Sequence, residues 1–394
     1  MAFNGNININ IPKELVLSAA SLVSDGGQSQ INSERLTLGN DLETGLATTS
    51  DKKGQLVFNS KQFLLQGGNI NLAGFDSFTV NATQGMATNG VSQLDAKSAQ
   101  VTFNTPLFTA LTGSQSTIST QKTLTIDSIE SQASSLDAAG GKLTLKANGL
   151  SVNSQLQAHS GKISLDAGTG ELLLGDKAKL DVSSHRKDFY DVTRYSPAGD
   201  INLQAQGDIK VTDKAQLNLA GLGDSQAGQL SIQGQGKIEL LALANAKAKN
   251  SSQSGRFSLT SASAIDLNNL VDWLNDSGFQ QSVNISSKQG NLVLATNKTL
   301  NAHQIQLQAQ GGTGQQDTQQ GNVIIDGTLN AANGQVAKIS LEGRSSVQIN
   351  GQLLANNAQQ AGEINLMTSG QSNGQVDANY GYRLVNANDS GKIV

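Results

Sequence analysis

The chain has 394 residues, a net charge of −4 and only 15% charged residues, so it lacks the cationic surface that binds nucleic acid or an anionic membrane. It has no cysteine, which excludes disulfides and thiolate metal sites. The 37% of apolar residues are few for a large globular core, while 42 glycines and only 3 prolines favour short strands that are paired almost throughout.

Residues 1–135 begin directly in strand-like alternation, with Ile7, Ile9 and Ile11 spaced two apart. Besides Phe3, six of the ten phenylalanines lie in this part, which predicts irregular Phe-rich coils with aromatic stacks inside: Phe58, Phe63, Phe75, Phe78, Phe103 and Phe108. The start lacks the basic and apolar regions of a signal peptide, and no run approaches the ~20 apolar residues of a membrane span. We therefore expect an internal segment of a longer chain, without membrane insertion.

A short phrase recurs along the chain: glycine, a polar residue, and two apolar residues that flank one further residue. Each copy is typical of a short strand that starts at a glycine, and recurrence every 20 to 40 residues or so indicates stacked repeats. Copies occupy residues 68–72, 141–145, 161–165, 199–203, 228–232, 255–259, 290–294, 321–325 and 362–366.

The repeat is plainest between residues 141 and 182, where each stretch of about 20 residues contains three apolar pairs. In one such coil Leu143 and Leu145 are followed by Leu150 and Val152, and then by Leu156. Three short strands per coil predict an all-β parallel β-helix, that is, a β-solenoid, hydrogen-bonded from coil to coil. We expect one continuous solenoid, irregular over 1–135 and regular over 136–394.

Two insertions interrupt the regular coils, at 183–198 and at 264–280. The first holds charged and aromatic residues, which we single out as a possible binding loop because loops on rigid scaffolds often bind ligands: Arg186, Lys187, Asp188, Tyr190, Asp191, Arg194 and Tyr195. In the second, Leu267, Leu270, Val271 and Leu274 have helical spacing, between an Asp266 N-cap and a Gly278 stop. This predicts a short lateral helix near 266–277, with Trp273 at its contact or its tip.

Catalytic and metal chemistry has little support in the sequence. General-base catalysis usually needs histidine, and we interpret His159, His185 and His303 as solvated residues of turns and loops. One glycine-rich stretch, 311–317, is close to a calcium-binding repeat but has Gln316 where the aspartate should stand. We therefore expect no enzyme activity, no catalytic residues, no cofactor and no metal.

The coils resemble those of the large exoproteins of two-partner secretion, the filamentous haemagglutinin and haemagglutinin/haemolysin-type adhesins. The resemblance lies in strand triplets such as 199–203, 207–211 and 215–219, in residues 74–80, and in the insertion at 267–279. It implies a right-handed parallel β-helix, export through an outer-membrane transporter partner, and display at the bacterial cell surface or release from it.

Three functions remain open from the sequence. The first is a structural stalk segment of a secreted or surface-displayed adhesin, which presents a long rigid face to a host or neighbouring cell by multivalent contacts. The second is a lateral module in which the 183–198 loop and the 264–280 helix, with Trp273, bind a glycan or protein. The third is a carbohydrate-active β-helix enzyme that uses Asp188 and Asp191.

Overall fold

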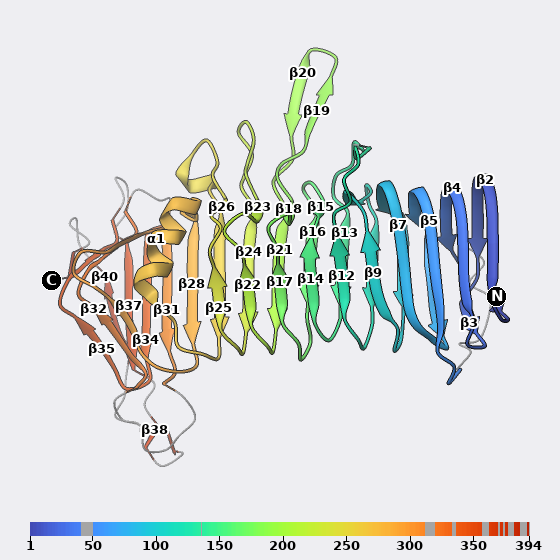
Figure 1. Ribbon diagram of the computed structural model, residues 1–394. Helices are drawn as coiled ribbons and strands as arrows, with labels where there is room; N and C mark the ends of the chain where they lie inside the picture. Colours follow the sequence, from blue (N-terminus) through green and yellow to red (C-terminus); the bar gives the residue numbers. More distant parts are fainter. Residues whose placement is uncertain are drawn as a thin grey trace. The chain divides into compact units, whose positions relative to one another are not determined.

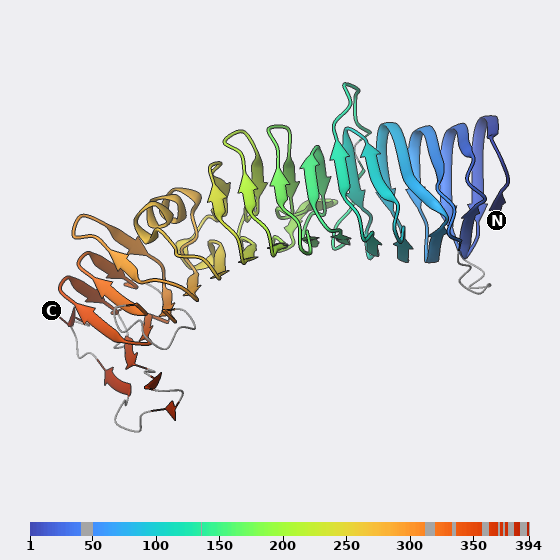
Figure 2. The same cartoon turned by 60° about the horizontal axis from the view of Figure 1, so that its bottom comes forward.

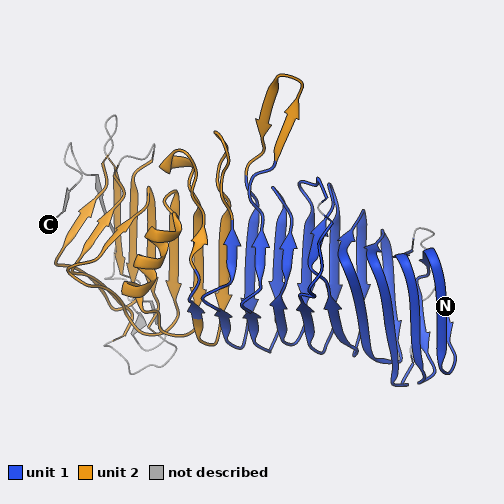
Figure 3. Ribbon diagram, turned by 45° about the horizontal axis from the view of Figure 1, so that its top comes forward, with its two compact units in different colours: residues 1–185, 198–218, 239–242 blue, residues 186–197, 219–238, 243–394 orange. Residues whose placement is uncertain are grey.

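The computed structural model describes residues 1–40, 50–134, 136–311, 320–332, 336–356, 362–368, 371–372, 375–376, 382–386 and 392–393. Strands hold 56% of the residues and helix 4%, and parallel sheets stack as a β-solenoid, which confirms the predicted fold class. The chain divides into two compact units (Figure 3). Unit 1 contains residues 1–185, 198–218 and 239–242, and unit 2 contains residues 186–197, 219–238 and 243–394.

One sheet of unit 1 takes a single strand from most of its coils, and its strands lie side by side in Figures 1 and 2. Its strands pair in parallel, and equivalent apolar residues stand in register, as Leu143 does with Ile163 and Ile201. Its strands are β1 (Ala2–Phe3), β3 (Ser21–Ser24), β6 (Gly68–Ala73), β8 (Val91–Asp95), β11 (Gln115–Ser119), β13 (Lys142–Lys146), β16 (Lys162–Asp166) and β21 (Asp200–Ala205).

The second sheet of unit 1 begins with four long strands and then divides into two rows of short strands. The long strands are β2 (Ile7–Ser18), β4 (Gln28–Gly39), β5 (Gly54–Leu65) and β7 (Phe75–Thr88). One row continues through β9 (Gln100–Asn104), β12 (Leu124–Asp127), β14 (Leu150–Asn153), β17 (Leu172–Leu174) and β22 (Ile209–Val211). The other continues through β10 (Leu107–Ala110), β15 (Gln155–Gln157), β18 (Lys179–Asp181) and β23 (Gln216–Asn218). The coils that begin with β8, β13, β16 and β21 therefore have the predicted three strands each, whereas the coil of β11 and β12 has two among the described residues.

Unit 2 repeats this plan with three sheets. The first contains β24 (Gln229–Gly234), β27 (Arg256–Ser261), β28 (Ser282–Ser287), β31 (Gln304–Ala309), β34 (Lys338–Gly343), β37 (Glu363–Thr368) and the antiparallel β40 (Tyr382–Asn386). The second contains β29 (Leu292–Leu294), β32 (Asn322–Ile325) and β35 (Ser346–Ile349). The third contains β30 (Thr299–Asn301), β33 (Thr328–Asn330), β36 (Gln352–Leu354) and the antiparallel β41 (Lys392–Ile393). The other strands outside the hairpin described below are β25 (Ile238–Leu240), β26 (Ala244–Asn245), β38 (Gln371–Ser372) and β39 (Gln375–Val376).

The core of unit 1 follows from the alternation of each strand, which turns every second side chain inward. In the long coils the inward rings form the expected aromatic stack. The ring centroid of Phe78 lies 5.4 Å from that of Phe58 and 6.3 Å from that of Phe103. The centroids of Phe103 and Phe108 are 5.9 Å apart, and all three contacts are edge to face. This geometry adds to the burial of the rings themselves.

A ladder of asparagines runs across the long strands of the same unit. Asn32, Asn59, Asn81 and Asn104 each donate from Nδ2 to the Oδ1 of the asparagine one coil earlier, over distances of 2.6–2.7 Å, and the first of them donates to Asn10. Parallel, in-register pairing brings these side chains into contact, and the ladder satisfies the hydrogen bonds of their amide groups. Each step of the ladder requires asparagine at the equivalent position of the next coil.

The glycines that open the repeated phrase are required by the close approach of successive coils. A Cβ added at Gly161 would stand 2.0 Å from the carbonyl oxygen of Gly141, and one at Gly199 would stand 1.9 Å from that of Gly161. Any side chain here would separate the coils, so a column of glycines accompanies the column of strands.

The predicted lateral helix is present as α1 (Leu267–Ser277), with a short 3-10 helix, η1 (Ser251–Gln253), before it in the chain. Asp266 caps its start by accepting from the backbone N–H groups of Asn268 and Asn269. Gly278 ends it in the left-handed conformation at φ 84°. Both boundary residues are those predicted from the sequence.

Candidate binding site on the hairpin

The predicted loop at 183–198 contains an antiparallel hairpin of unit 2, formed by β19 (Arg186–Phe189) and β20 (Val192–Tyr195). All eight of its strand residues are exposed. Exposed strands without an apolar face of their own cannot be explained by core packing, so the hairpin is the first candidate for a binding site.

Pairing sorts its side chains onto two faces, because directly opposed residues of a hairpin lie on the same side. One face carries the pairs Arg186–Tyr195 and Asp188–Thr193. The other carries Lys187–Arg194 and, next to it, Phe189–Val192. The structure therefore brings together seven of the eight predicted binding residues, and it adds Phe189, Val192 and Thr193, which sequence reasoning passed over.

The first face is held by its own hydrogen bonds. The carboxylate of Asp188 accepts from the Thr193 hydroxyl at 2.6 Å and from Arg186 Nε at 3.1 Å. These two donors, the Thr193 hydroxyl above all, lower the pKa of Asp188 below its usual value. At the base, the Tyr195 ring lies against Gly223, where an added Cβ would stand 2.5 Å from the ring.

The second face and the tip present cations beside apolar groups. Lys187 and Arg194 are directly opposed, an arrangement of like charges that destabilises a hairpin and is therefore suited to receiving an anion. Phe189 is 55% exposed, and Tyr190 at the turn is fully exposed with a left-handed φ of 52°. Aromatic rings and cations displayed together can stack on a sugar ring and pair with an acidic substituent.

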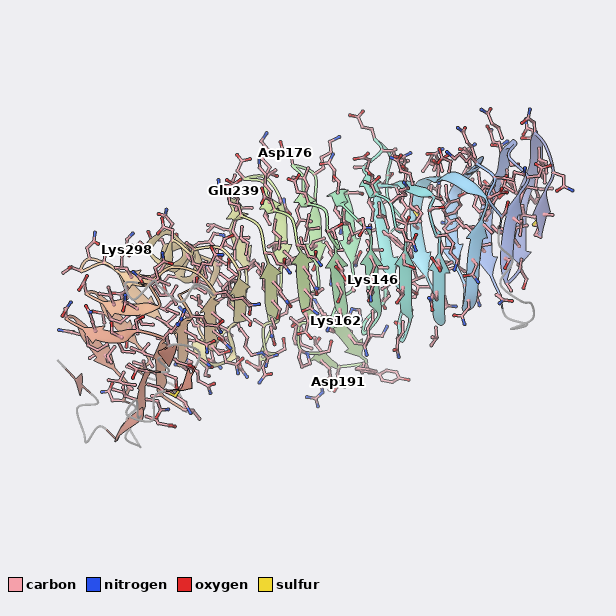
Figure 4. All side chains as sticks on the ribbon, turned by 90° about the horizontal axis from the view of Figure 1, so that it is seen from below. Lys146, Lys162, Asp176, Asp191, Glu239 and Lys298 are labelled. Carbon is pink, nitrogen blue, oxygen red and sulfur yellow. The ribbon has the colours of Figure 1, made fainter. Side chains whose placement is uncertain are left out.

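Trp273 does not belong to this surface. Its side chain is buried, with ring centroids 5.8 Å from Phe257 and 5.6 Å from Phe279. Figure 1 shows the hairpin of β19 and β20 apart from α1. Figure 4 shows Asp191, at the turn of the hairpin, apart from Lys298, which forms an ion pair with Asp272 of α1. The expectation that Trp273 would help to form one lateral site with the hairpin is therefore wrong, because its indole fills the contact between α1 and the coils.

The histidines are more buried than the sequence suggested, so their interpretation as solvated residues is wrong. His159 and His185 of unit 1 are half-buried, with ring centroids 6.3 Å apart. Their partners are acidic: Asp137 lies 3.1 Å from His185 Nε2, and the buried Asp181 lies 3.6 Å from His159 Nδ1. Parallel stacking brings these residues together from separate coils, a proximity that sequence spacing does not reveal.

Ser183 lies between His159 and Asp181 without the arrangement of an activated nucleophile. Its hydroxyl donates to Asp181 Oδ1 at 2.7 Å, and its oxygen is 3.3 Å from His159 Nδ1. The serine is buried, so its hydroxyl has little contact with solvent. The cluster satisfies a buried carboxylate, as buried charges require.

His303 of unit 2 is also buried, at 9% exposure, and neither ring nitrogen makes a hydrogen bond of normal geometry. Burial lowers its pKa below the usual 6.5, against a smaller opposing influence of backbone groups of Ala332 and Ser251.

No group of three or more histidine, aspartate or glutamate side chains is placed to hold a metal ion in the described part of the chain. Of the glycine-rich stretch at 311–317, only Gly311 lies within the described residues. Among the residues that the structure places, no helix has the length and apolar character needed to cross a membrane.

Comparison with known proteins finds no matching family model, no matching curated protein and no matching solved structure.

Proposed function

We propose that the chain is a stalk segment of a secreted or surface-displayed bacterial exoprotein, and that its β19–β20 hairpin attaches it to an acidic glycan on a host or neighbouring cell. The observation that carries the proposal is the hairpin itself. An exposed Lys187–Arg194 pair next to Phe189 and the fully exposed Tyr190 suits a carboxylated or sulfated sugar. Exposed aromatic rings supply stacking, and the cations supply charge complementarity.

The stalk part of the proposal is supported by coil-to-coil pairing within each unit. Parallel ladders and stacked apolar residues resist bending more than a chain of separate domains does. Export through an outer-membrane transporter partner belongs to the same proposal, and its support is the resemblance of the repeated strand triplets to two-partner exoproteins. Small-angle scattering of the purified chain tests the stalk part of the proposal, since a stiff spacer requires a particle with a high axial ratio.

The hairpin part is tested by measuring binding to an array of acidic and neutral glycans. The variant Lys187→Gln/Arg194→Gln should lose most binding to acidic glycans, and Tyr190→Ala should weaken binding to every glycan that the protein recognises. Lys214→Gln, an exposed cation outside both the hairpin and the groove described below, is the matched control and should bind as the wild type does. Equal loss in the control, or binding that survives both hairpin variants, would contradict the proposal; binding to a protein receptor alone would identify the other class of partner.

A further inference from the structure

A groove lies on the outer face of the second sheet of unit 1, separate from the hairpin. Its volume is about 260 Å³, and most of its lining is apolar. Its floor is formed by outward side chains of four successive strands, and one row of that floor is Thr37, Leu64, Ala87 and Thr109, paired in register. These side chains should face water in a simple coil, yet Ala87 and Thr109 are buried.

A second row and a covering segment give the groove its shape. Arg35, Gln62 and Gly85 pair in register two residues before the first row. Gly85 leaves the floor open, since an added Cβ there would meet only a carbonyl oxygen at 3.4 Å. Along the side, the N–H of Ser134 donates to the carbonyl of Gln84. Three strand spacings give a length of about 14 Å, and rows two residues apart give a width of about 7 Å. This is space for one extended chain.

The far end of the groove holds an unsatisfied polar atom. Thr109 lines the groove and is 1% exposed, and its Oγ1 has no hydrogen-bond partner. A buried hydroxyl without a partner destabilises the fold, so its presence needs an explanation. A ligand that carries a polar group to this end would supply the missing bond.

The near end carries the Arg35–Glu14 pair, at 3.5 Å between Nη2 and Oε2. Both side chains are more than half exposed, so the contact is weak. A guanidinium has five N–H donors, and a single contact with Glu14 leaves donors for a second carboxylate.

We propose that this groove binds an unbranched aliphatic carboxylate with a hydroxyl or similar polar group at its opposite end. The carboxylate pairs with Arg35, the methylenes lie over Leu64 and Ala87, and the distal group bonds to Thr109. The inference is independent of the hairpin and of the stalk role.

Calorimetric titration of the full chain with 10-hydroxydecanoate, decanoate and 1,10-decanediol tests each contact. We expect 10-hydroxydecanoate to bind most tightly, because decanoate lacks the distal hydroxyl and the diol lacks the carboxylate. Thr109→Val should weaken only the two hydroxyl-bearing probes, by about fivefold. Arg35→Gln should weaken the two carboxylates and spare the diol. Ala87→Leu, which fills the floor, should weaken all three roughly tenfold.

Thr102→Val is the matched control, since Thr102 is an outward threonine of β9 that does not line the groove. It should change no affinity, and circular dichroism and the urea midpoint confirm that each variant is folded. Absence of saturable binding to the folded wild type below the micellar concentration of the probes would overturn the proposal. So would a Thr109→Val variant that binds 10-hydroxydecanoate as the wild type does, which would assign a water molecule to that hydroxyl.

Discussion

The indole of Trp273 is stacked on Phe279, with 5.6 Å between ring centroids and 22° between ring planes. Phe257 of β27 completes the cluster at 5.4 Å from Phe279. The helix α1 thus contributes its largest side chain to the core of unit 2, and this contact holds the insertion against the coils.

Replacement of Trp273 by alanine should destabilise the protein by about 3–5 kcal/mol, because it removes a buried ring and leaves a cavity between Phe257 and Phe279. Urea denaturation followed by circular dichroism measures the change. Tyr190→Ala, at the exposed tip of the hairpin, should leave the urea midpoint unaltered. A Trp273→Ala variant of wild-type stability would show that α1 is not docked as described.

The asparagine ladder makes a second prediction. Asn59 both donates to Asn32 and accepts from Asn81, whereas Asn10, at the exposed end of the ladder, accepts from Asn32. Asn59→Ala should lower the free energy of unfolding by about 1–2 kcal/mol, and Asn10→Ala should lower it by less. Urea midpoints of the two variants compare them directly, and equal losses would argue against a cooperative ladder.

The stacked glycines predict a larger effect. In Gly161→Ala the new methyl carbon would approach the Gly141 carbonyl oxygen to 2.0 Å, so neighbouring coils must move apart, at a cost of about 3 kcal/mol. Gly113→Ala is the control: it meets no atom within 4 Å but has φ 72°, so it carries only backbone strain of about 1 kcal/mol. The midpoint of thermal unfolding should therefore be much lower for Gly161→Ala than for Gly113→Ala. The reverse order would show that backbone strain at a positive φ costs more stability than a clash between neighbouring coils.

His303 predicts a dependence of stability on pH. Because burial lowers its pKa in the folded state below 6.5, the unfolded chain takes up the proton first as pH falls. The stabilising contribution of the neutral ring is present above that value and is lost as pH falls towards the folded pKa. His303→Leu should therefore lose less stability than the wild type between about pH 7.5 and pH 5.5, measured by urea midpoints. The difference in urea midpoint between the wild type and His303→Leu removes the contributions of His159 and His185, which both proteins share. Identical slopes of midpoint against pH would contradict the assignment of this pH dependence to His303.

Much of the fold is readable from the sequence because the solenoid repeats one local rule. The alternation of Leu143 with Leu145 and of Ile163 with Leu165 predicts both the strands and their parallel stacking, and Asp266 and Gly278 mark the ends of α1. The hairpin residues were identified as a charged and aromatic insertion, but the sequence did not predict that Lys187 would stand opposite Arg194.

The remainder depends on distances between coils, which no local pattern contains. Asp137 and His185 are 48 positions apart and lie within 3.1 Å, because coils of unequal length return the chain to the same edge. The groove over Ala87 and Thr109 also needs the register of four strands and a covering segment to become visible. The prediction that Trp273 lies at the contact of the helix or at its tip is confirmed for the contact, and only its possible share in a binding site is wrong, because its neighbours Phe257 and Phe279 are not visible in the local sequence.

The matching register of β13 and β16 also bears on how a protein of this kind can change its length. Lys142 pairs with Gln115 on one side and with Lys162 on the other, and each residue of β16 repeats the environment of its counterpart in β13. Excision of residues 142–161 would therefore bring Lys162 directly onto Gln115 and keep every inward position aliphatic. Loss of a single residue within β13 would instead turn its threonine towards the interior. Duplication or removal of whole coils therefore disturbs the core less than small insertions or deletions within a strand, and is the easier way for such a protein to change its length in evolution.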